Sequence, residues 1–164
     1  MLVIRKVKDC DLEDLCRIRF ADRPEVHLKR IRQSLAGEID YLVAEVDGHL
    51  AGYALLLLKA PSDWLDETSR FPRLIDLYVD KALRNQGTGR AIVKEAEEIT
   101  LQHGFNELNL SVAPLTNPRA HQLYQKLGYV PVQNQTYIKK QTTQSDGQTD
   151  AVEVTLIDLV KVLA

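Results

Sequence analysis

Runs of apolar residues in the first half of the chain predict two helices followed by a hairpin of two strands. Asp47-Gly48 separates the apolar runs Tyr41–Val46 and His49–Lys59, and an Asp-Gly pair between two such runs favours the tight turn of a β-hairpin. The elements expected before the hairpin are a strand at Val3, Ile4 and Val7, a helix that Asp9 or Asp11 caps and that carries Leu12, Leu15, Cys16 and Ile18, and a second helix from Pro24 to Gly37.

One helix in the second half is marked at both ends by residues that favour helix termini. Asn117 is a good N-cap, Pro118 suits the first helical position, and Gly128 suits the C-terminal stop. The other expected elements, in chain order, are a loop from Ala60 to Phe71, a strand from Leu74 to Val79, a helix from Gly87 to His103, a strand from Phe105 to Val112, extended segments at Tyr129–Val132 and Tyr137–Lys140, a polar turn from Gln141 to Asp150, and a strand from Val152 to Val162.

The order of these elements predicts a mixed α/β fold around one central sheet, with residues 1–164 forming a single domain. Strands joined by the tight hairpin are expected to be antiparallel. The strand–helix–strand unit from Leu74 to Val112 is expected to pair in parallel through a right-handed crossover.

The composition is that of an ordinary soluble globular protein. Of 164 residues, 45% are hydrophobic, and 21 basic against 23 acidic residues give a formal net charge of −2. A nucleic-acid partner is therefore not expected, because it needs a basic face that follows the phosphates.

Cysteine spacing and the lengths of apolar runs bear on metal, disulfide and membrane sites. Cys10 and Cys16 form no Cys-x-x-Cys pair, so neither a metal site nor a disulfide is expected, and a reducing cytoplasm is the simplest setting. The first residues lack the long apolar core of a signal peptide, and Leu55–Leu58 is too short to cross a bilayer. No membrane partner is expected.

A glycine-rich segment after the expected strand Leu74–Val79 has the character of a phosphate-binding turn. Residues 84–90 read Arg-Asn-Gln-Gly-Thr-Gly-Arg and open a helix. Free N–H groups and the positive end of the helix dipole attract an anion at such a start, and glycine lets the main chain approach it closely. We therefore expect a phosphorylated compound to bind at Gln86–Arg90.

Two common phosphate motifs fit this segment poorly. The Walker pattern G-x-x-x-x-G-K-[ST] is absent. The pattern G-x-G-x-x-G begins correctly at Gly87, but Ile92 stands where a small residue is needed. A dinucleotide-binding fold also carries this motif after its first strand, not midway along the chain.

A different signature matches better. Residues Arg84–Gly89 resemble the [QR]-x-x-G-x-[GA] motif of the GNAT superfamily of N-acetyltransferases, and they follow the expected strand as in that family. Residues Asn117–Tyr129, read as N-x-x-A-x-x-x-Y-x-x-x-G-Y, are similar to the family's second motif. The resemblance is specific from about Leu74 to Tyr129 and covers the rest of the chain by element order alone.

This resemblance implies acetyl-CoA as the donor of an acetyl group and a primary amine, on a small molecule or a protein, as the acceptor. Direct transfer without a covalent enzyme intermediate is expected, since Cys10 and Cys16 lie outside the motifs. The resemblance also implies a mostly antiparallel sheet whose bulged fourth strand splays from the fifth, so that unpaired main-chain groups bind the pantetheine arm. The residues that it places at the cofactor are Leu77, Tyr78, Val79, Arg84, Asn85, Gln86, Gly87, Thr88, Gly89, Arg90, Asn117 and Tyr124.

Two residues are candidates for proton transfer, and each has a structural alternative. The resemblance makes Tyr124 the general acid for the departing thiolate, whereas periodicity alone makes it a core tyrosine. Asp76 is the acidic residue of its strand and the candidate base; the alternative is a hydrogen-bonded carboxylate near the bulge. Asp22, Glu25 and His27 are further candidates on the substrate side.

The acceptor and the function class leave alternatives open. Asp63, Asp66 and Glu67 surround Trp64 and would attract a polyamine, an aminoglycoside or a lysine side chain, unless this loop is simply solvated. The competing class is a non-catalytic acyl-CoA-binding or sensing module on the same fold. The apolar run Val152–Val162 is a candidate contact of a homodimer.

Overall fold

The computed structural model describes the backbone of residues 1–145 and 148–163 and the side chains of residues 1–132 and 155–163. Within that part of the chain, seven strands and four α-helices form a mixed α/β fold with a mostly antiparallel sheet flanked by helices, as the sequence predicted. The chain divides into two compact units, one of residues 1–108 with Leu163 and one of residues 109–162. That residues 1–164 form a single domain stays a prediction.

Four antiparallel strands form the sheet of the first unit. Their order is β1 (Leu2–Lys6), β2 (Asp40–Val46), β3 (His49–Leu57) and β4 (Arg73–Val79). The predicted hairpin is confirmed, because Asp47-Gly48 joins β2 to β3 with φ values of 51° and 86°. Positive φ at both central residues matches the turn type whose twist suits a hairpin.

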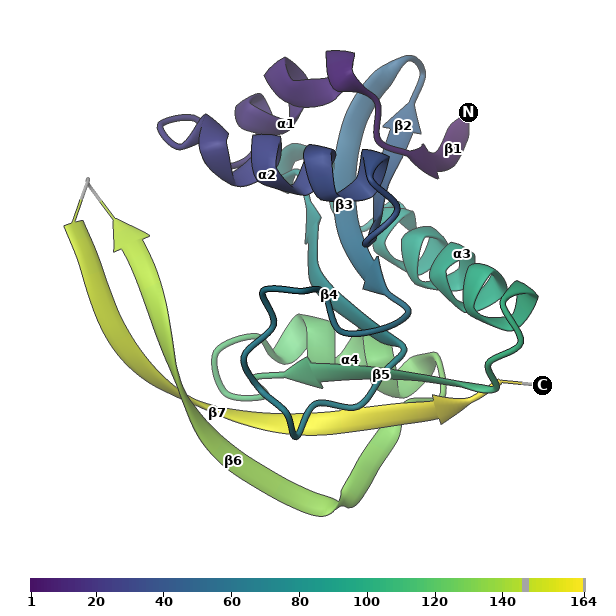
Figure 1. The fold of residues 1–164 in the computed structure, drawn as a ribbon, viewed down its shortest axis with the longest axis vertical. Helices are drawn as coiled ribbons and strands as arrows, with labels where there is room; N and C mark the ends of the chain where they lie inside the picture. Colours follow the sequence, from purple (N-terminus) through teal and green to yellow (C-terminus); the bar gives the residue numbers. More distant parts are fainter. Residues whose placement is uncertain (146–147, 164) are drawn as a thin grey trace. The chain divides into compact units, whose positions relative to one another are not determined.

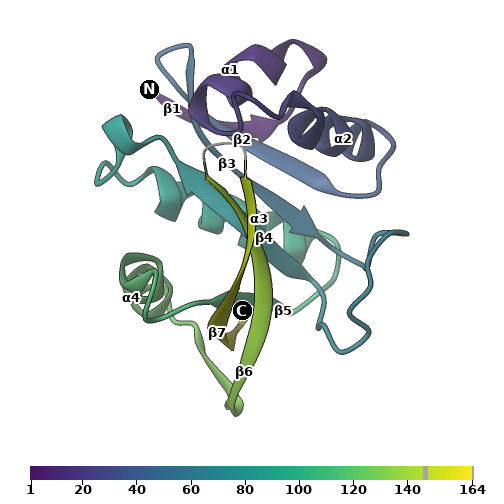
Figure 2. The ribbon, with the colours of Figure 1, turned by 90° about the vertical axis from the view of Figure 1, so that its left-hand side faces the viewer.

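Helices cover both faces of this sheet. Figures 1 and 2 show α1 (Leu12–Ile18) and α2 (Pro24–Leu35) on one side of β2 and β3, and α3 (Thr88–Gln102) on the other. Successive side chains of a strand point to opposite faces, so each strand supplies both cores. The core beside α1 and α2 contains Leu15, Ile31, Tyr41, Val43, Tyr53, Leu55 and Leu57, and the buried residues that face α3 include Leu42, Ala44, Ala54 and Leu56 together with Ile92, Val93 and Ala96 of the helix itself.

The start of α1 agrees only in part with the prediction that Asp9 or Asp11 caps it, because Asp11 occupies the N-cap position but its side chain makes no cap hydrogen bond. A 3-10 turn at Asp9–Asp11 precedes the helix, and α1 has no side-chain cap. The carboxylate of Asp11 instead accepts hydrogen bonds from the Lys8 N–H at 2.7 Å and from Arg5 at 2.8 Å. The ion pair with β1 therefore fixes the turn rather than the helix.

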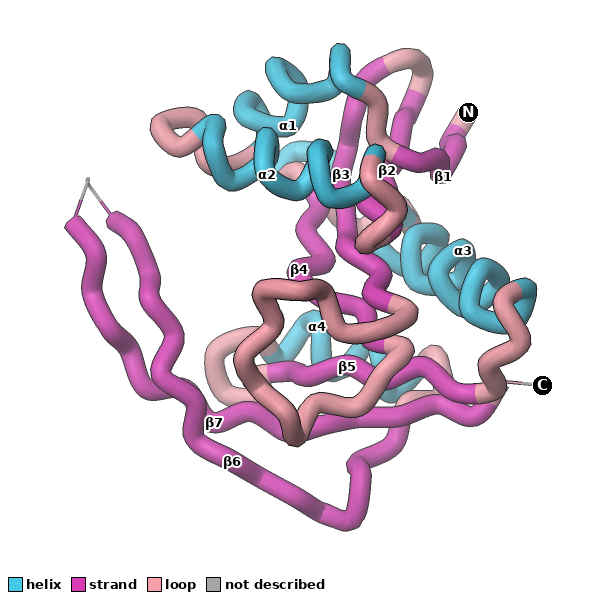
Figure 3. Tube along the Cα trace, viewed as in Figure 1, coloured by secondary structure: helices cyan, strands magenta, loops and turns pink. Residues whose placement is uncertain are grey.

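A long loop joins β3 to β4, as predicted (Figure 3). The Trp64 ring packs edge-on against Phe71 with centroids 5.5 Å apart, and Trp64 Nε1 donates to the Asp66 carbonyl at 2.9 Å. Asp63 of this loop pairs with Lys29 of α2 at 2.6 Å. These contacts give the loop a defined path over the sheet.

The second unit contains α4 (Pro118–Lys126), β6 (Val130–Ser145), β7 (Gln148–Val162) and the end of β5 (Glu107–Val112). The predicted helix cap is confirmed, because Asn117 Oδ1 accepts from the Ala120 N–H at 3.3 Å.

The β6–β7 hairpin is longer than the sequence predicted. Its pairing extends from Val130 opposite Val160 to Ser145 opposite Gln148. The prediction of a turn over Gln141–Asp150 is therefore wrong for residues 141–145 and 148–150, which lie in the strands. Polar side chains led to the loop assignment there, but threonine is a good strand former and a two-stranded ribbon does not need apolar residues at every position. Asp146 and Gly147 lie outside the described residues.

Candidate active site

The centre of β4 carries a β-bulge. Tyr53 pairs with Tyr78 and Leu55 pairs with Ile75, so the single residue Ala54 of β3 stands opposite two residues of β4. These two are Asp76 and Leu77, and Asp76 has a φ of 52°. That left-handed conformation is uncommon outside glycine, although aspartate tolerates it better than most residues. The bulge takes main-chain groups of β4 out of the regular ladder, as the resemblance implied for this strand.

Two guanidinium groups hold the carboxylate of Asp76. Arg19 Nη1 lies 2.8 Å from Oδ1, and Arg30 Nη1 lies 2.7 Å from Oδ2. The Tyr53 hydroxyl is 3.5 Å from Oδ2. The Asp76 side chain is 24% exposed, and that of Arg30 is 20% exposed, so water screens this cluster only in part. The geometry agrees with the structural alternative for Asp76 and leaves its role as a base a hypothesis.

Arg19 and Arg30 were not expected at the site. They lie 57 and 46 residues before Asp76 in the sequence, too far for a local pattern to link them to it. The one available signal was Asp76 itself, since a carboxylate within an otherwise apolar strand needs a cation or hydrogen-bond donors.

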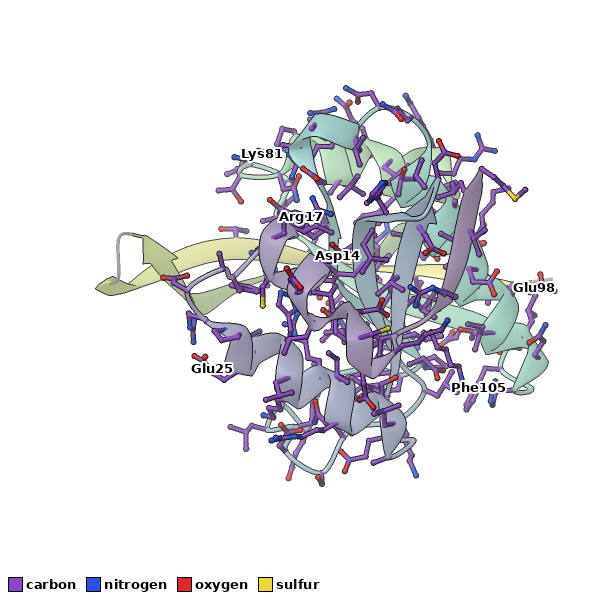
Figure 4. The ribbon with its side chains drawn as sticks, turned by 90° about the horizontal axis from the view of Figure 1, so that it is seen from above. Asp14, Arg17, Glu25, Lys81, Glu98 and Phe105 are labelled. Carbon is purple, nitrogen blue, oxygen red and sulfur yellow. The ribbon has the colours of Figure 1, made fainter. Side chains whose placement is uncertain are left out.

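A buried histidine, His27, forms hydrogen bonds with Tyr41 and with the main chain of Arg19. His27 Nε2 lies 2.8 Å from the Arg19 carbonyl, which can only accept, so Nε2 carries the proton and Nδ1 accepts from the Tyr41 hydroxyl at 2.7 Å. Burial lowers the pKa of His27. Burial also raises the pKa of Tyr53 to about 12. His27 is thus an internal hydrogen-bonding group, whereas Glu25 is exposed near the start of α2 (Figure 4).

The turn between β4 and α3 has an open, strongly curved backbone. Asn85 and Gly87 have φ values of 66° and 83°, and α3 begins at Thr88. A Cβ at Gly87 would meet no atom within 4 Å, so space lies directly above the turn. The first N–H groups of a helix have no partner within it. The binding of an anion at Gln86–Arg90 stays a prediction.

A hydrogen bond from Arg84 connects this turn to the end of β4. Arg84 Nε donates to the Val79 carbonyl at 2.9 Å, and its guanidinium lies 5.2 Å from the centroid of the Tyr78 ring. The structure thereby brings together the expected cofactor residues of β4, Leu77 to Val79, and those of the turn, Arg84 to Arg90.

The remaining expected site residues lie in the second unit. Tyr124 of α4 is 7% exposed, and its ring lies 6.0 Å from that of Tyr129 in a T-shaped arrangement. Asn117 caps α4 with its side-chain oxygen. The approach of Tyr124 and Asn117 to β4 stays a prediction.

A pocket opens beside the bulge within the first unit. It has a volume of about 320 Å³ and lies between α2, β3, β4 and the β3–β4 loop. Ile75, the residue before Asp76, forms part of its wall. The lining residues are Val26, Lys29, Arg30, Gln33, Ile39, Leu55, Leu57, Pro61, Asp63, Trp64 and Ile75.

The described part of the chain contains neither a cluster of metal-ligating side chains nor a membrane-spanning helix. No three histidine, cysteine, aspartate or glutamate side chains are grouped to hold a metal ion among those whose positions are described. Within the same limits, no helix has the length and apolar character to cross a bilayer. Both Cys10 and Cys16 are free thiols.

Comparisons with known structures give the same fold. A ribosomal-protein-alanine N-acetyltransferase from Brucella melitensis superposes with a TM-score of 0.72 at 23% identity, covering 98% of this chain and 99% of the other. An N-acetyltransferase, paia, from Thermoplasma acidophilum in complex with coenzyme A gives 0.67 at 22% identity, with 99% coverage of both chains. The acetyltransferase yncA from Salmonella typhimurium, solved with acetyl-CoA, gives 0.69 at 17% identity, covering 100% of this chain and 95% of its own.

Sequence comparison identifies the family. A thialysine N-epsilon-acetyltransferase from Bos taurus is 30% identical over 146 residues, which cover 77% of this chain and 83% of the relative. The model of the acetyltransferase (GNAT) family matches residues 10–129. This match covers most of the chain, including the bulged strand and the glycine-rich turn. The chain therefore belongs to the GNAT family of acetyltransferases.

Proposed function

We infer that the protein transfers an acetyl group from acetyl-CoA directly to a primary amine. One observation carries this proposal. The bulge at Asp76–Leu77 lies on β4, and a hydrogen bond from Arg84 connects the open turn Gln86–Arg90 to the end of the same strand. Main-chain groups for an amide-rich arm and a site for its phosphates therefore follow one another along β4 and α3.

The residues present fit acetyl-CoA. A Cβ at Gly87 would meet no atom within 4 Å, which supports placing the diphosphate at this turn. The exposed Arg90 adds a positive charge in the first turn of α3. Leu77, Tyr78 and Val79 would offer main-chain groups to the pantetheine arm, as an added strand does at a sheet edge. Asn85, Thr88 and Gly89 complete the turn, and Asn117 would contact the arm from α4.

Each reacting group has a proposed partner in the chain. Acetyl-CoA supplies the acetyl group as a thioester. A main-chain N–H near the bulge would stabilise negative charge on the thioester oxygen, because a fixed donor needs no reorganisation as charge develops. The Tyr124 hydroxyl would protonate the departing thiolate. Asp76, through water, would take the proton of the amine, or would instead fix the bulge that orients the thioester.

The nature of the acceptor is supported by the curated relatives. The bovine relative is named for acetylation of thialysine at its ε position, and a second relative, from Sus scrofa, carries the same name at 28% identity. These names support an amine on a small molecule as the acceptor of this chain.

Release of free CoA thiol over a panel of amines tests the proposal. Calorimetry first measures binding of acetyl-CoA to the purified protein, and thiol release is then followed with each amine. Binding together with amine-dependent release supports the proposal. Binding without release on every amine would favour a sensing module, and the absence of binding would reject both functions.

A further inference from the structure

The pocket beside the bulge combines an apolar interior with charged groups at defined places. Val26, Ile39, Leu55, Leu57 and Ile75 contribute apolar surface. A volume of about 320 Å³ lies at the small end of the range of ligand sites. The pocket therefore suits the hydrocarbon part of a small molecule rather than a large polymer.

The acidic loop does not make this pocket acidic. Of the three acidic residues near Trp64, Asp63 alone is among the lining residues. Its carboxylate already pairs with Lys29 at 2.6 Å and accepts from Gln33 Nε2 at 3.4 Å. Asp66 Oδ1 accepts from both the N–H and the hydroxyl of Thr68 within the loop. A polycation would therefore find little uncompensated negative charge here.

The balance of charge around the pocket is positive. Its lining contains the cations Lys29 and Arg30 and the anion Asp63. Arg30 also pairs with Asp76, and Asp76 pairs with Arg19, so the connected cluster includes one more anion and one more cation. Three cations against two anions leave one positive charge. A carboxylate group on the ligand would offset this positive charge.

Arg30 connects the pocket to the bulge. It lines the pocket and also contacts Asp76 through Nη1 at 2.7 Å. A guanidinium has five N–H donors in a planar fork that matches a carboxylate. Nη1 of Arg30 contacts Asp76, and the guanidinium also interacts with the Tyr41 hydroxyl, so these two partners engage part of the fork. A carboxylate bound at Arg30 would lie close to the bulge, where the proposed transfer occurs.

We propose that the acceptor is an α-amino acid with a largely apolar side chain, and that Arg30 binds its carboxylate. The α-amine, one carbon away from the carboxylate, faces the bulge, and the side chain enters the pocket beside Trp64. This proposal rests on the proposed acetyl transfer for the position of the amine, whereas the binding of the carboxylate rests on the pocket alone.

Intrinsic fluorescence provides a test that does not depend on catalysis. Trp64 is the single tryptophan of the chain and lines the pocket, so a ligand in the pocket changes its emission. The titrants are matched compounds that differ at the carboxylate: leucine and isoamylamine, and phenylalanine, phenylalaninamide and phenethylamine. Each titration is performed with and without saturating CoA.

We expect the free amino acid of at least one set to bind about tenfold or more tightly than its partners, the scale of one charge-assisted hydrogen bond. The variant Arg30→Gln removes this preference, Arg30→Lys keeps part of it, and Arg32→Gln, which removes an exposed cation of the same helix outside the pocket, leaves it unchanged. Equal or weaker binding of the amino acids, or no binding in any set, would overturn the proposal without the need for a variant.

Turnover assays separate this proposal from the proposed function. If amino acids bind with the expected preference but thiol release is never observed, acetyl transfer is wrong and the carboxylate site stands. If amines are acetylated but the carboxylate confers no preference, acetyl transfer stands and the carboxylate site is wrong. If phenylalaninamide is preferred, the occupant is the N-terminal end of a peptide, and the proposal fails.

Discussion

Arg30 reaches from α2 to the bulge of β4, where its Nη1 lies 2.7 Å from Oδ2 of Asp76. The two residues are 46 positions apart in the sequence. Together with Arg19, this contact ties a strand residue of left-handed conformation to the helical layer above it. The shape of β4 thus depends on two arginines outside the motifs that define the family.

Replacing Asp76 with asparagine should therefore destabilise the fold. It would leave Arg19 and Arg30 side by side without an anion, and removing one member of a partly buried ion pair costs about 1–3 kcal/mol, between the values for exposed and buried pairs. Urea unfolding measures this loss. The control Asp14→Asn, whose partner Arg17 is about half exposed on α1 (Figure 4), should change stability by less than about 0.5 kcal/mol.

The same variant distinguishes the two roles of Asp76. If Asp76 is the base, one limb of the pH–rate profile is lost in the variant. If it fixes the bulge, the profile keeps its shape while kcat/KM falls at every pH.

Replacing Tyr124 with phenylalanine should lower turnover by about tenfold or more, since a positioned acid contributes about 10²–10⁴-fold. The fold should survive, because the ring and its T-shaped contact with Tyr129 remain. Steady-state kinetics and a thermal melt measure the two effects, with Tyr129→Phe as a control for the loss of a tyrosine hydroxyl in the same unit. Unchanged turnover would remove Tyr124 from the mechanism.

Reversing the charge of Arg90 should weaken CoA binding without affecting the fold. Arg90 is exposed in the first turn of α3, where a negative side chain would repel the phosphates. The dissociation constant from calorimetry should rise by about fivefold for Arg90→Glu, the scale of one exposed charge interaction, and the effect should shrink in high salt. Lys94→Glu, one turn further along, is the control; an equal effect there would mean that net charge alone is responsible.

Stability should fall as the pH drops below about 6.5. Burial lowers the pKa of His27 from its ordinary value of 6.5, so in the acidic range the unfolded chain binds a proton that the folded chain does not. The proton is taken up on unfolding, and the free energy of unfolding therefore decreases from pH 6.5 down to the folded-state pKa. Urea unfolding at about pH 7 and about pH 5 measures the decrease, which His27→Gln should reduce and the exposed-site variant His49→Gln should not.

Introducing a side chain at Gly52 should displace β4. A Cβ there would lie 2.6 Å from the Tyr78 carbonyl oxygen and 3.2 Å from Val79 Cα. Since both atoms belong to the backbone, Gly52→Ala should cost about 1–3 kcal/mol by overpacking and should weaken CoA binding as well. Gly104→Ala adds backbone strain at a φ of 87° with open space around it, so it should reduce stability alone. Normal CoA affinity in Gly52→Ala would argue against a role for Tyr78 and Val79 in binding.

Local signals were sufficient for the first hairpin and for two of the elements that hold expected cofactor residues. The Asp47-Gly48 turn, the cap at Asn117 and the glycine-rich start of α3 each depend on neighbouring residues, and the structure has each of them in place. The Arg19 and Arg30 contacts could not be predicted in this way, because they join segments that are distant in sequence. The length of β6 was underestimated for a related reason: its pairing with β7 stabilises polar residues that have no strand pattern of their own.

The ion pair between Lys29 and Asp63 has a consequence for how ligands enter the pocket. Its side chains are 64% and 47% exposed, and such surface pairs contribute only about 0–1 kcal/mol. Thermal motion at ambient temperature is therefore enough to separate these two side chains, which both line the pocket, while Trp64 stays packed against Phe71. Admission of a small molecule should be quick, and its rate should increase when added electrolyte weakens the attraction between the two side chains.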